Sequence, residues 1–304
     1  MRQLSRIAAA SAAAGLAVTA CGGSTNVLQG RSTQQIVTLA STSITQSSYH
    51  MTVHGTLSVD ASSVQGVPEQ ELNQFGAALK NLTVDGSGDV QSAQRMRFTI
   101  TLKPVVDKPI QVVLYDGGAY VSQDGGKTFA DAGSFDFSGL PASPAELSAI
   151  LKDLGSPQDQ GSQTRDGQSV EKLHAAIGQD FISKVLSQMN GGAQAQQFAA
   201  LFAQVMTVKN GSVDLFVRHS DGKLDAANTS ATLAIDMARL IGALAQAFGG
   251  QLPIDASGVS GSLVLSEAVS STFSNYGEKV SISKPTVDPN APGLPSGAGG
   301  LFGA

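Results

Sequence analysis

Cysteine and tryptophan are nearly missing from this chain. Its 304 residues include one cysteine, Cys21, and no tryptophan. A single cysteine excludes an internal disulfide and a zinc site built from several thiolates. Aromatic residues make up only 5% of the chain, whereas glycine alone contributes 34 residues. A core made mainly of small and aliphatic side chains either leaves room for a ligand or lets helices approach a sheet closely.

The first twenty residues lack an apolar run long enough to cross a bilayer. Arg2 and Arg6 precede the apolar run Ile7–Val18, which is shorter than the roughly 20 residues of a membrane-spanning helix. This order predicts a secretory signal peptide at residues 1–20. The run ends in Val18-Thr19-Ala20-Cys21, which resembles the lipobox of bacterial lipoproteins. The resemblance implies that Cys21 is acylated and anchors the chain to the extracytoplasmic face of the cell membrane. An ordinary signal peptide with a chance cysteine is the alternative.

Positive charge is also scarce. Loss of Arg2 and Arg6 with the signal peptide leaves 17 of the 19 basic residues against 24 acidic residues, a balance of −7. This argues against nucleic acid as a partner and against electrostatic attachment to anionic lipids. Membrane attachment is therefore expected from the acyl chains on Cys21, because two chains supply the hydrophobic contact that stable anchoring needs.

The mature chain divides into three parts by composition. Gly22-Gly23-Ser24 opens a flexible tether over residues 21–32. Residues 33–284 form the folded domain. Residues 285–304 are rich in Pro and Gly without a period and are predicted to be a disordered tail.

Residues 33–284 mix helical periodicity with strict alternation. A helix is predicted over 33–47, and Tyr49–Asp60 and Arg95–Lys103 alternate between apolar and polar residues, as half-buried strands do. Asp-Gly turns at Asp116-Gly117, Asp166-Gly167 and Asp221-Gly222 predict antiparallel hairpins. A helical region at 179–206 and two last strands at 259–269 and 272–283 complete the pattern. The sequence predicts about ten or eleven strands, mostly antiparallel.

Two amphipathic helices are predicted between strands, one in each half of the domain. The first spans Pro68–Asn81 and the second spans Asp236–Phe248. A long sheet with one apolar face must be covered, and these helices are the available cover. The predicted fold class is therefore α+β, with a large curled antiparallel sheet, a half-barrel, wrapped over several helices.

This plan resembles the LppX/LprG-type bacterial lipoproteins of the LolA/LolB-like superfamily. The residues that carry the resemblance are Val18-Thr19-Ala20-Cys21, Tyr49–Asp60, Leu82–Gly88 leading into Arg95–Lys103, and the hairpin Leu114–Val121. The resemblance implies a carrier that holds a lipid or lipoglycan in an apolar cavity and moves it within the envelope with an envelope transport protein as partner. The residues expected to line such a cavity are Met51, Val53, Leu72, Phe75, Leu79, Met96, Phe98, Ile100, Leu240, Ile241, Leu244 and Phe248.

No motif for catalysis, a cofactor or a metal is present in the sequence. His50 and His54 share a strand face but lie about 13 Å apart, too far to share a metal ion; they are expected to be solvated. No Gly-x-Ser-x-Gly occurs. The chain is therefore expected not to be an enzyme and to need no cofactor. A scaffolding lipoprotein with a filled core is the alternative function, and an envelope hydrolase is a third reading without a motif.

Overall fold

One large sheet dominates the computed structural model of the protein. The structure describes residues 26–67, 82–104, 106, 108–134, 151, 154, 157–181, 183, 201, 203–247 and 258–292. Its strands are β1 (Tyr49–Asp60), β2 (Leu82–Ser92), β3 (Arg95–Lys103), β4 (Ile110–Tyr115), β5 (Gly118–Ser122), β6 (Ala130–Ser134), β7 (Gln158–Arg165), β8 (Gln168–Ala176), β9 (Met206–Arg218), β10 (Leu224–Asp236) and β11 (Ser262–Ser274). Two helices are described in full, α1 (Thr33–Gln46) and α6 (Met237–Ala247).

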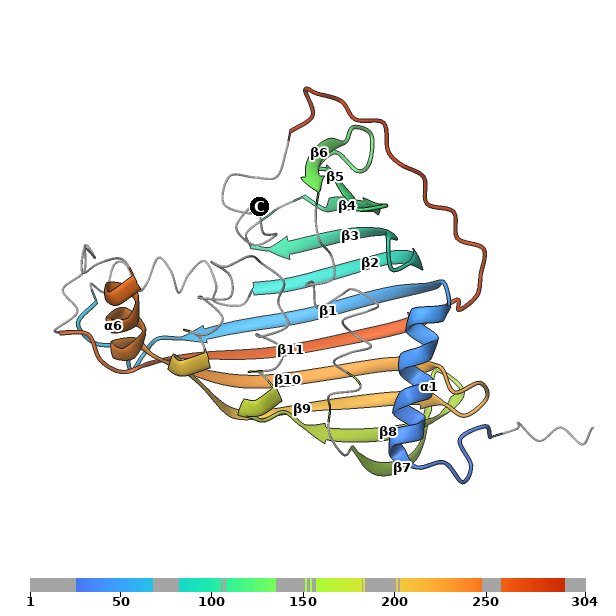
Figure 1. Ribbon diagram of the computed structural model, residues 1–304, viewed down its shortest axis with the longest axis horizontal. Coiled ribbons are helices and arrows are strands. Elements are labelled where there is room, and N and C mark those ends of the chain that lie inside the picture. The colour runs from blue at the N-terminus through green and yellow to red at the C-terminus, as the bar shows by residue number, and fades with distance from the viewer. Residues whose placement is uncertain are drawn as a thin grey trace, which may run out of the picture.

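The eleven strands form a single antiparallel sheet in the order β6-β5-β4-β3-β2-β1-β11-β10-β9-β8-β7. β1 and β11, the first and last of the described strands, pair at the centre from His50–Ser274 to Asp60–Val264 without a register shift. β6 and β7 are the two edges, so the sheet is not closed into a barrel (Figure 1). The predicted α+β architecture with a large antiparallel sheet is confirmed.

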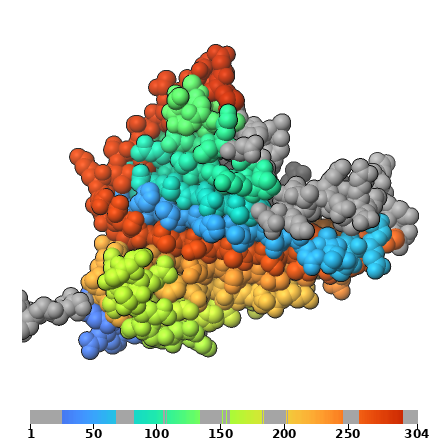
Figure 2. Space-filling model, turned by 180° about the vertical axis from the view of Figure 1, so that it is seen from behind, coloured from blue at the N-terminus to red at the C-terminus, as the bar shows by residue number. Residues whose placement is uncertain are grey.

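The alternation of the strands gives the sheet two different faces. On β1, Met51 and Val59 are buried while Thr52 and Ser58 are exposed. We call the face that carries Met51 the inner face; α1 lies across one end of its strands and α6 lies at the other end (Figure 1). The opposite, outer face shows β1, β11 and β10 side by side, and no helix of the described residues lies over them (Figure 2).

Helix α1 begins with a capping box. The backbone N–H of Gln35 donates to Ser32 Oγ, and the Gln35 side chain accepts from the backbone N–H of Ser32 at 2.9 Å. This arrangement satisfies two donors that a helix start leaves free. Ile36, Val37, Ala40 and Ile44 then form one buried stripe, as the spacing of three and four residues predicts.

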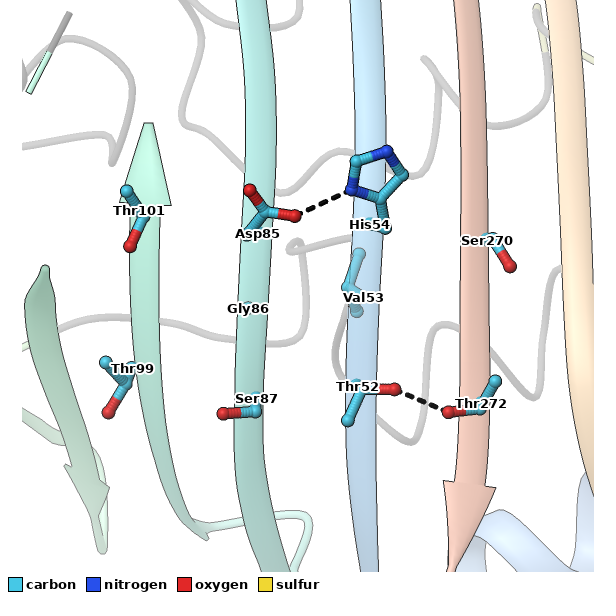
Figure 3. A pocket seen from close by; sticks show the side chains of 10 residues that line it. All are labelled: Thr52, Val53, His54, Asp85, Gly86, Ser87, Thr99, Thr101, Ser270 and Thr272. Atoms are coloured by element: carbon cyan, nitrogen blue, oxygen red, sulfur yellow. Dashed lines mark hydrogen bonds and ion pairs between the residues drawn. The ribbon is translucent and has the colours of Figure 1, made fainter. Parts of the chain in front are cut away.

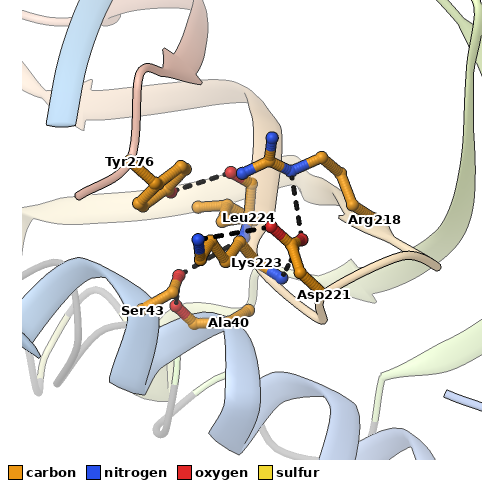
Figure 4. Close-up of polar contacts among 7 residues, drawn as sticks. All are labelled: Ala40, Ser43, Arg218, Asp221, Lys223, Leu224 and Tyr276. Carbon is orange, nitrogen blue, oxygen red and sulfur yellow. Dashed lines mark hydrogen bonds and ion pairs between the residues drawn. The ribbon is translucent and has the colours of Figure 1, made fainter. Parts of the chain in front are cut away.

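Polar contacts lock this helix onto the sheet (Figure 4). Ser43 Oγ donates to the Ala40 carbonyl at 2.6 Å and accepts from the backbone N–H of Leu224 at 3.4 Å. The Tyr276 hydroxyl donates to the Leu224 carbonyl at 2.8 Å. The β9–β10 turn is closed by Asp221, which pairs with Arg218 and Lys223 at 3.3 Å each. The helix, the turn and the segment after β11 therefore form one unit.

Three elements differ from the sequence prediction. The strand expected at 259–269 and the start of the strand expected at 272–283 form the single strand β11, because its register with β10 continues through Ser270 and Ser271. Residues 275–283, expected to continue the second strand, are turn and coil. Met206, expected at the end of a helix, begins β9. The sequence predicts the turn at Asp166-Gly167 but no strand pattern before it, because the residues of β7 include no apolar side chain to alternate. The structure places a strand there.

The other predicted segments are described in part. α6 matches the second inserted helix, with Asp236 Oδ1 accepting from the backbone N–H of Arg239 at 3.0 Å. The first inserted helix, Pro68–Asn81, lies outside the described residues, as do Cys21 and the signal peptide. Of the predicted tail, residues 285–292 are described, and Val287 bridges to Phe129.

Candidate functional site

The inner face carries one large apolar cluster at the α1 end. Met51 and Met96 are buried in it together with Tyr49, Val90 and Phe273. Val53 and Phe98 pack against the cluster but stay partly exposed, and Ile100 is also only partly buried. Five of the residues predicted to line a cavity thus share the inner face: Met51, Val53, Met96, Phe98 and Ile100. Their contact with a ligand stays a prediction.

A second, smaller apolar cluster lies at the α6 end. Val59, Met206, Ile235 and Leu263 are its buried strand residues, and Leu240 of α6 packs against it. Ile241 is buried and Leu244 is partly buried. The remaining predicted lining residues, Leu72, Phe75, Leu79 and Phe248, lie outside the described residues.

Between the two clusters the inner face is apolar but incompletely covered. Leu57, Val84 and Val269 join Val53 and Ile100 as inner-facing residues that keep part of their surface exposed. Monomeric proteins seldom leave a contiguous apolar surface open to water unless it binds something. This middle region of the inner face is therefore the candidate site for an apolar ligand.

One charged side chain stands in that region. Glu267 of β11 pairs in register with Leu57 of β1 and with Ala231 of β10, both inner-facing. Desolvation by the surrounding protein raises the pKa of this carboxyl although solvent still reaches it. The sequence carried a signal for this residue, because Glu267 occupies an apolar position in the alternation of Leu263, Leu265 and Val269.

The outer face holds a shallow polar groove of about 450 Å³ (Figure 3). Its side chains come from four neighbouring strands and are mostly hydroxyls: Thr52, His54, Asp85, Ser87, Thr99, Thr101, Ser270 and Thr272. Thr52 and Thr272 are hydrogen bonded across β1 and β11 at 2.5 Å, and His54 Nδ1 lies 2.6 Å from Asp85 Oδ1. The groove therefore offers several hydroxyl groups, and its residues were not predicted from the sequence as a site.

Histidines on the outer face pair with carboxylates of neighbouring strands. His50 Nδ1 lies 2.8 Å from Asp89 Oδ1, and His174 Nδ1 lies 2.7 Å from Asp214 Oδ1. Each pair joins residues directly opposite each other in register. His54 is the most exposed of these histidines, with 62% of its side-chain surface open to solvent. No three metal-binding groups come together in the described part of the chain.

A serine, a histidine and a glutamate form a hydrogen-bonded chain at the corner of β8 and β9. Ser169 Oγ lies 3.0 Å from His219 Nδ1, and Glu171 Oε2 lies 2.7 Å from His219 Nε2. Serine hydrolases present the opposite ring nitrogen to the nucleophile. Here the backbone N–H of His219 donates to the Ser169 carbonyl, and its own carbonyl accepts from the backbone N–H of Val27. These hydrogen bonds around His219 therefore fasten the segment before α1 to the sheet.

Comparison with known proteins gives similarities to solved structures at 10–15% sequence identity. No family model matches the sequence, and no curated protein matches it. Similar solved structures include LprF from Mycobacterium bovis, with 15% identity, a TM-score of 0.39 and coverage of 83% of this chain and 96% of that one. The lipoprotein LppX from Mycobacterium tuberculosis follows with 13% identity, a TM-score of 0.38 and coverage of 82% and 96%.

A LolA superfamily protein from Nitrosomonas europaea is also similar, with 10% identity, a TM-score of 0.28 and coverage of 83% of this chain and 98% of that one. Within the described residues, no helix is both long enough and apolar enough to span a membrane.

Proposed function

We propose that this protein is a non-catalytic envelope lipoprotein that carries a lipid on the inner face of its sheet, tethered to the extracytoplasmic face of the membrane through acylated Cys21. The observation that carries the proposal is the middle of the inner face, where Val53, Phe98 and Ile100 remain partly exposed between two buried clusters. The lipobox sequence at Cys21 supports the location. A partner protein in the envelope would deliver or receive the lipid.

The mechanism is physical rather than chemical. Each methylene group that moves from water to an apolar surface contributes about 0.8 kcal/mol. An acyl chain leaving a bilayer is therefore bound only if the protein shields most of its length. An open sheet with an apolar inner face offers a long surface of this kind without a covalent step.

The absence of tryptophan from the chain provides a direct test. Ile100 faces inward and Thr101, the next residue, faces the outer groove. Ile100→Trp and Thr101→Trp each place a single fluorophore on one face, in a chain whose Cys21 is replaced by serine so that it carries no acyl chains. Vesicles of phospholipid brominated on the acyl chains are then added, and the fluorescence is recorded after the vesicles are removed.

Carriage on the inner face predicts that brominated lipid quenches Trp at position 100 and leaves Trp at position 101 unquenched. Mass spectrometry of the same samples should find about one lipid per chain. Circular dichroism confirms that both variants are folded. Equal quenching at the two positions, or no retained lipid, would contradict the proposal.

A further inference from the structure

Strand β11 places a carboxylate where the rest of the strand is apolar. Six residues of β11 face inward: Leu263, Leu265, Glu267, Val269, Ser271 and Phe273. Glu267 is the only charged one among them. Because the register of β11 with both neighbours has no shift along this stretch, Glu267 belongs to the inner face together with the buried Phe273 and Leu263.

The neighbours of Glu267 on the inner face offer no counter-charge. Its direct cross-strand partners are Leu57 and Ala231. The diagonal neighbours on the same face, about 7–8 Å away in such a sheet, are Gly55, Val59, Thr229 and Leu233. In the described part of the chain, no hydrogen bond or ion pair joins Glu267 to another side chain, so its carboxylate relies on water.

A bound lipid would remove that water. Covering the middle of the inner face takes away the solvent that still reaches Glu267, and an ionised carboxylate without water or a partner is strongly disfavoured. A ligand that brings its own cation compensates this cost, and a primary ammonium group supplies three hydrogen-bond donors together with the charge. A ligand with an anionic head adds repulsion instead.

We propose that Glu267 binds the primary ammonium group of an aminolipid head and thereby selects the lipid carried on the inner face. This inference rests on the proposed carrier function. Ligand pockets are mostly apolar with a few polar groups that fix orientation. Glu267 would be such a group, with the acyl chains directed along Val53 and Ile100.

The test compares three head groups on one set of acyl chains. Vesicles contain equal amounts of phosphatidylethanolamine, phosphatidylcholine and phosphatidylglycerol, and the lipid retained by the non-acylated chain is measured by mass spectrometry. The wild-type chain should enrich phosphatidylethanolamine about tenfold over phosphatidylglycerol, as expected for one charge-assisted hydrogen bond. Phosphatidylcholine, which has the charge but no N–H donor, should fall between them.

Glu267→Gln removes the charge while keeping the shape of the side chain. It should abolish the enrichment, whereas Glu278→Gln, which makes the same change at an exposed position after β11, should preserve it. An unchanged head-group preference in Glu267→Gln overturns the assignment even if lipid is still carried. A wild-type chain that retains no lipid overturns the carrier function itself, so the two failures are distinguishable.

A measurement without ligand tests the premise that the protein partly desolvates Glu267. Its pKa is raised in the folded chain, so ionisation costs stability, and that cost appears as pH rises above the ordinary glutamate range. Glu267→Gln should therefore melt at a higher temperature than the wild type at pH 7, and the difference should vanish below about pH 4. Equal melting temperatures at pH 7 would remove the premise.

Discussion

At the scale of single residues, two glycines on the inner face of β2 have different roles. A Cβ built on Gly88 would overlap the Arg97 carbonyl oxygen and lie 2.8 Å from the Cα of Phe98. A Cβ on Gly86 would lie 3.7 Å from the nearest atom, the Thr99 carbonyl oxygen. Gly88 is therefore the position that lets β3 and its Phe98 side chain approach β2.

Alanine substitution should separate these two positions. Gly88→Ala is expected to lower the free energy of unfolding by about 1–3 kcal/mol, because the methyl group has no space without a backbone shift. Gly86→Ala is the matched control and should change it by less than about 1 kcal/mol, since glycine in a strand interior is itself unfavourable. Urea denaturation followed by circular dichroism measures both. Equal losses would mean that β2 and β3 are not held in this close contact.

Glu267 illustrates what sequence reasoning misses at this scale. The alternation that identified the apolar residues of β1 and β3 also runs through β11, and a charge at an apolar position in it was a readable signal. The sequence did not show that Leu57 and Ala231 flank it, because strand neighbours far apart in the chain are set by the sheet order. The importance of the residue therefore emerges only from the register.

At the scale of elements, two tyrosines in contact join α1 and the segment after β11 to the core. The rings of Tyr49 and Tyr276 lie 5.6 Å apart, and burial raises the pKa of both hydroxyls. Tyr276 donates its hydroxyl to the Leu224 carbonyl, whereas the buried Tyr49 hydroxyl has no hydrogen-bond partner among the described residues. Of these two neighbouring tyrosines, one hydroxyl is therefore stabilised by a hydrogen bond and the other is buried without one in the described part of the chain.

Removal of each hydroxyl should reveal this difference. Tyr276→Phe is expected to lower the free energy of unfolding by about 1–3 kcal/mol, because it leaves the Leu224 carbonyl without its partner. Tyr49→Phe is expected to leave stability unchanged or raise it by about 1 kcal/mol, because it removes an unpaired buried polar group. Thermal melts of the two variants provide the comparison. A similar loss in both would show that Tyr49 has a partner after all.

Elements could be predicted from sequence where the apolar pattern was strong. β1, β3, α1 and α6 follow from their periodicity, and the Asp-Gly turns located the hairpins. β7 lacked the pattern because an edge strand with both faces wet has no apolar residues to alternate. The small polar side chains of Ser270 and Ser271 predict a break between two strands. In the structure, both serines pair with β1 and with β10, so β11 continues through them.

At the scale of the whole molecule, the predicted anchor at Cys21 would set which part of the domain lies nearest a membrane. The chain before α1 is fastened where the backbone N–H of Val27 donates to the His219 carbonyl at 2.8 Å. Four residues lie between Cys21 and Asn26, and the five Cα–Cα steps allow a reach of about 18 Å at full extension. If Cys21 is acylated, the corner formed by α1, β8 and β9 is the part of the domain held nearest the membrane.

Replacing the anchor residue should release the protein. Cys21→Ala is expected to move the chain from the membrane fraction to the soluble fraction without loss of fold, because the acidic mature chain has no electrostatic hold on anionic lipids. Ser24→Ala in the tether is the control and should stay with the membrane. Fractionation and immunoblotting measure the distribution. A Cys21→Ala chain that sediments with membranes would contradict anchoring through this residue.

An open sheet has unpaired edges that can join the edge of another sheet. β7 is one end of the sheet, so one side of its backbone has no strand partner in the described chain. Such edges invite edge-to-edge polymerisation, which proteins oppose with charge, irregular pairing and twist. β7 carries no apolar side chain, and its pairing is interrupted between Asp159 and Ser162, where Gly161 adopts a positive φ. The polar, irregular pairing of β7 thus opposes association of this edge with the sheet of a second copy.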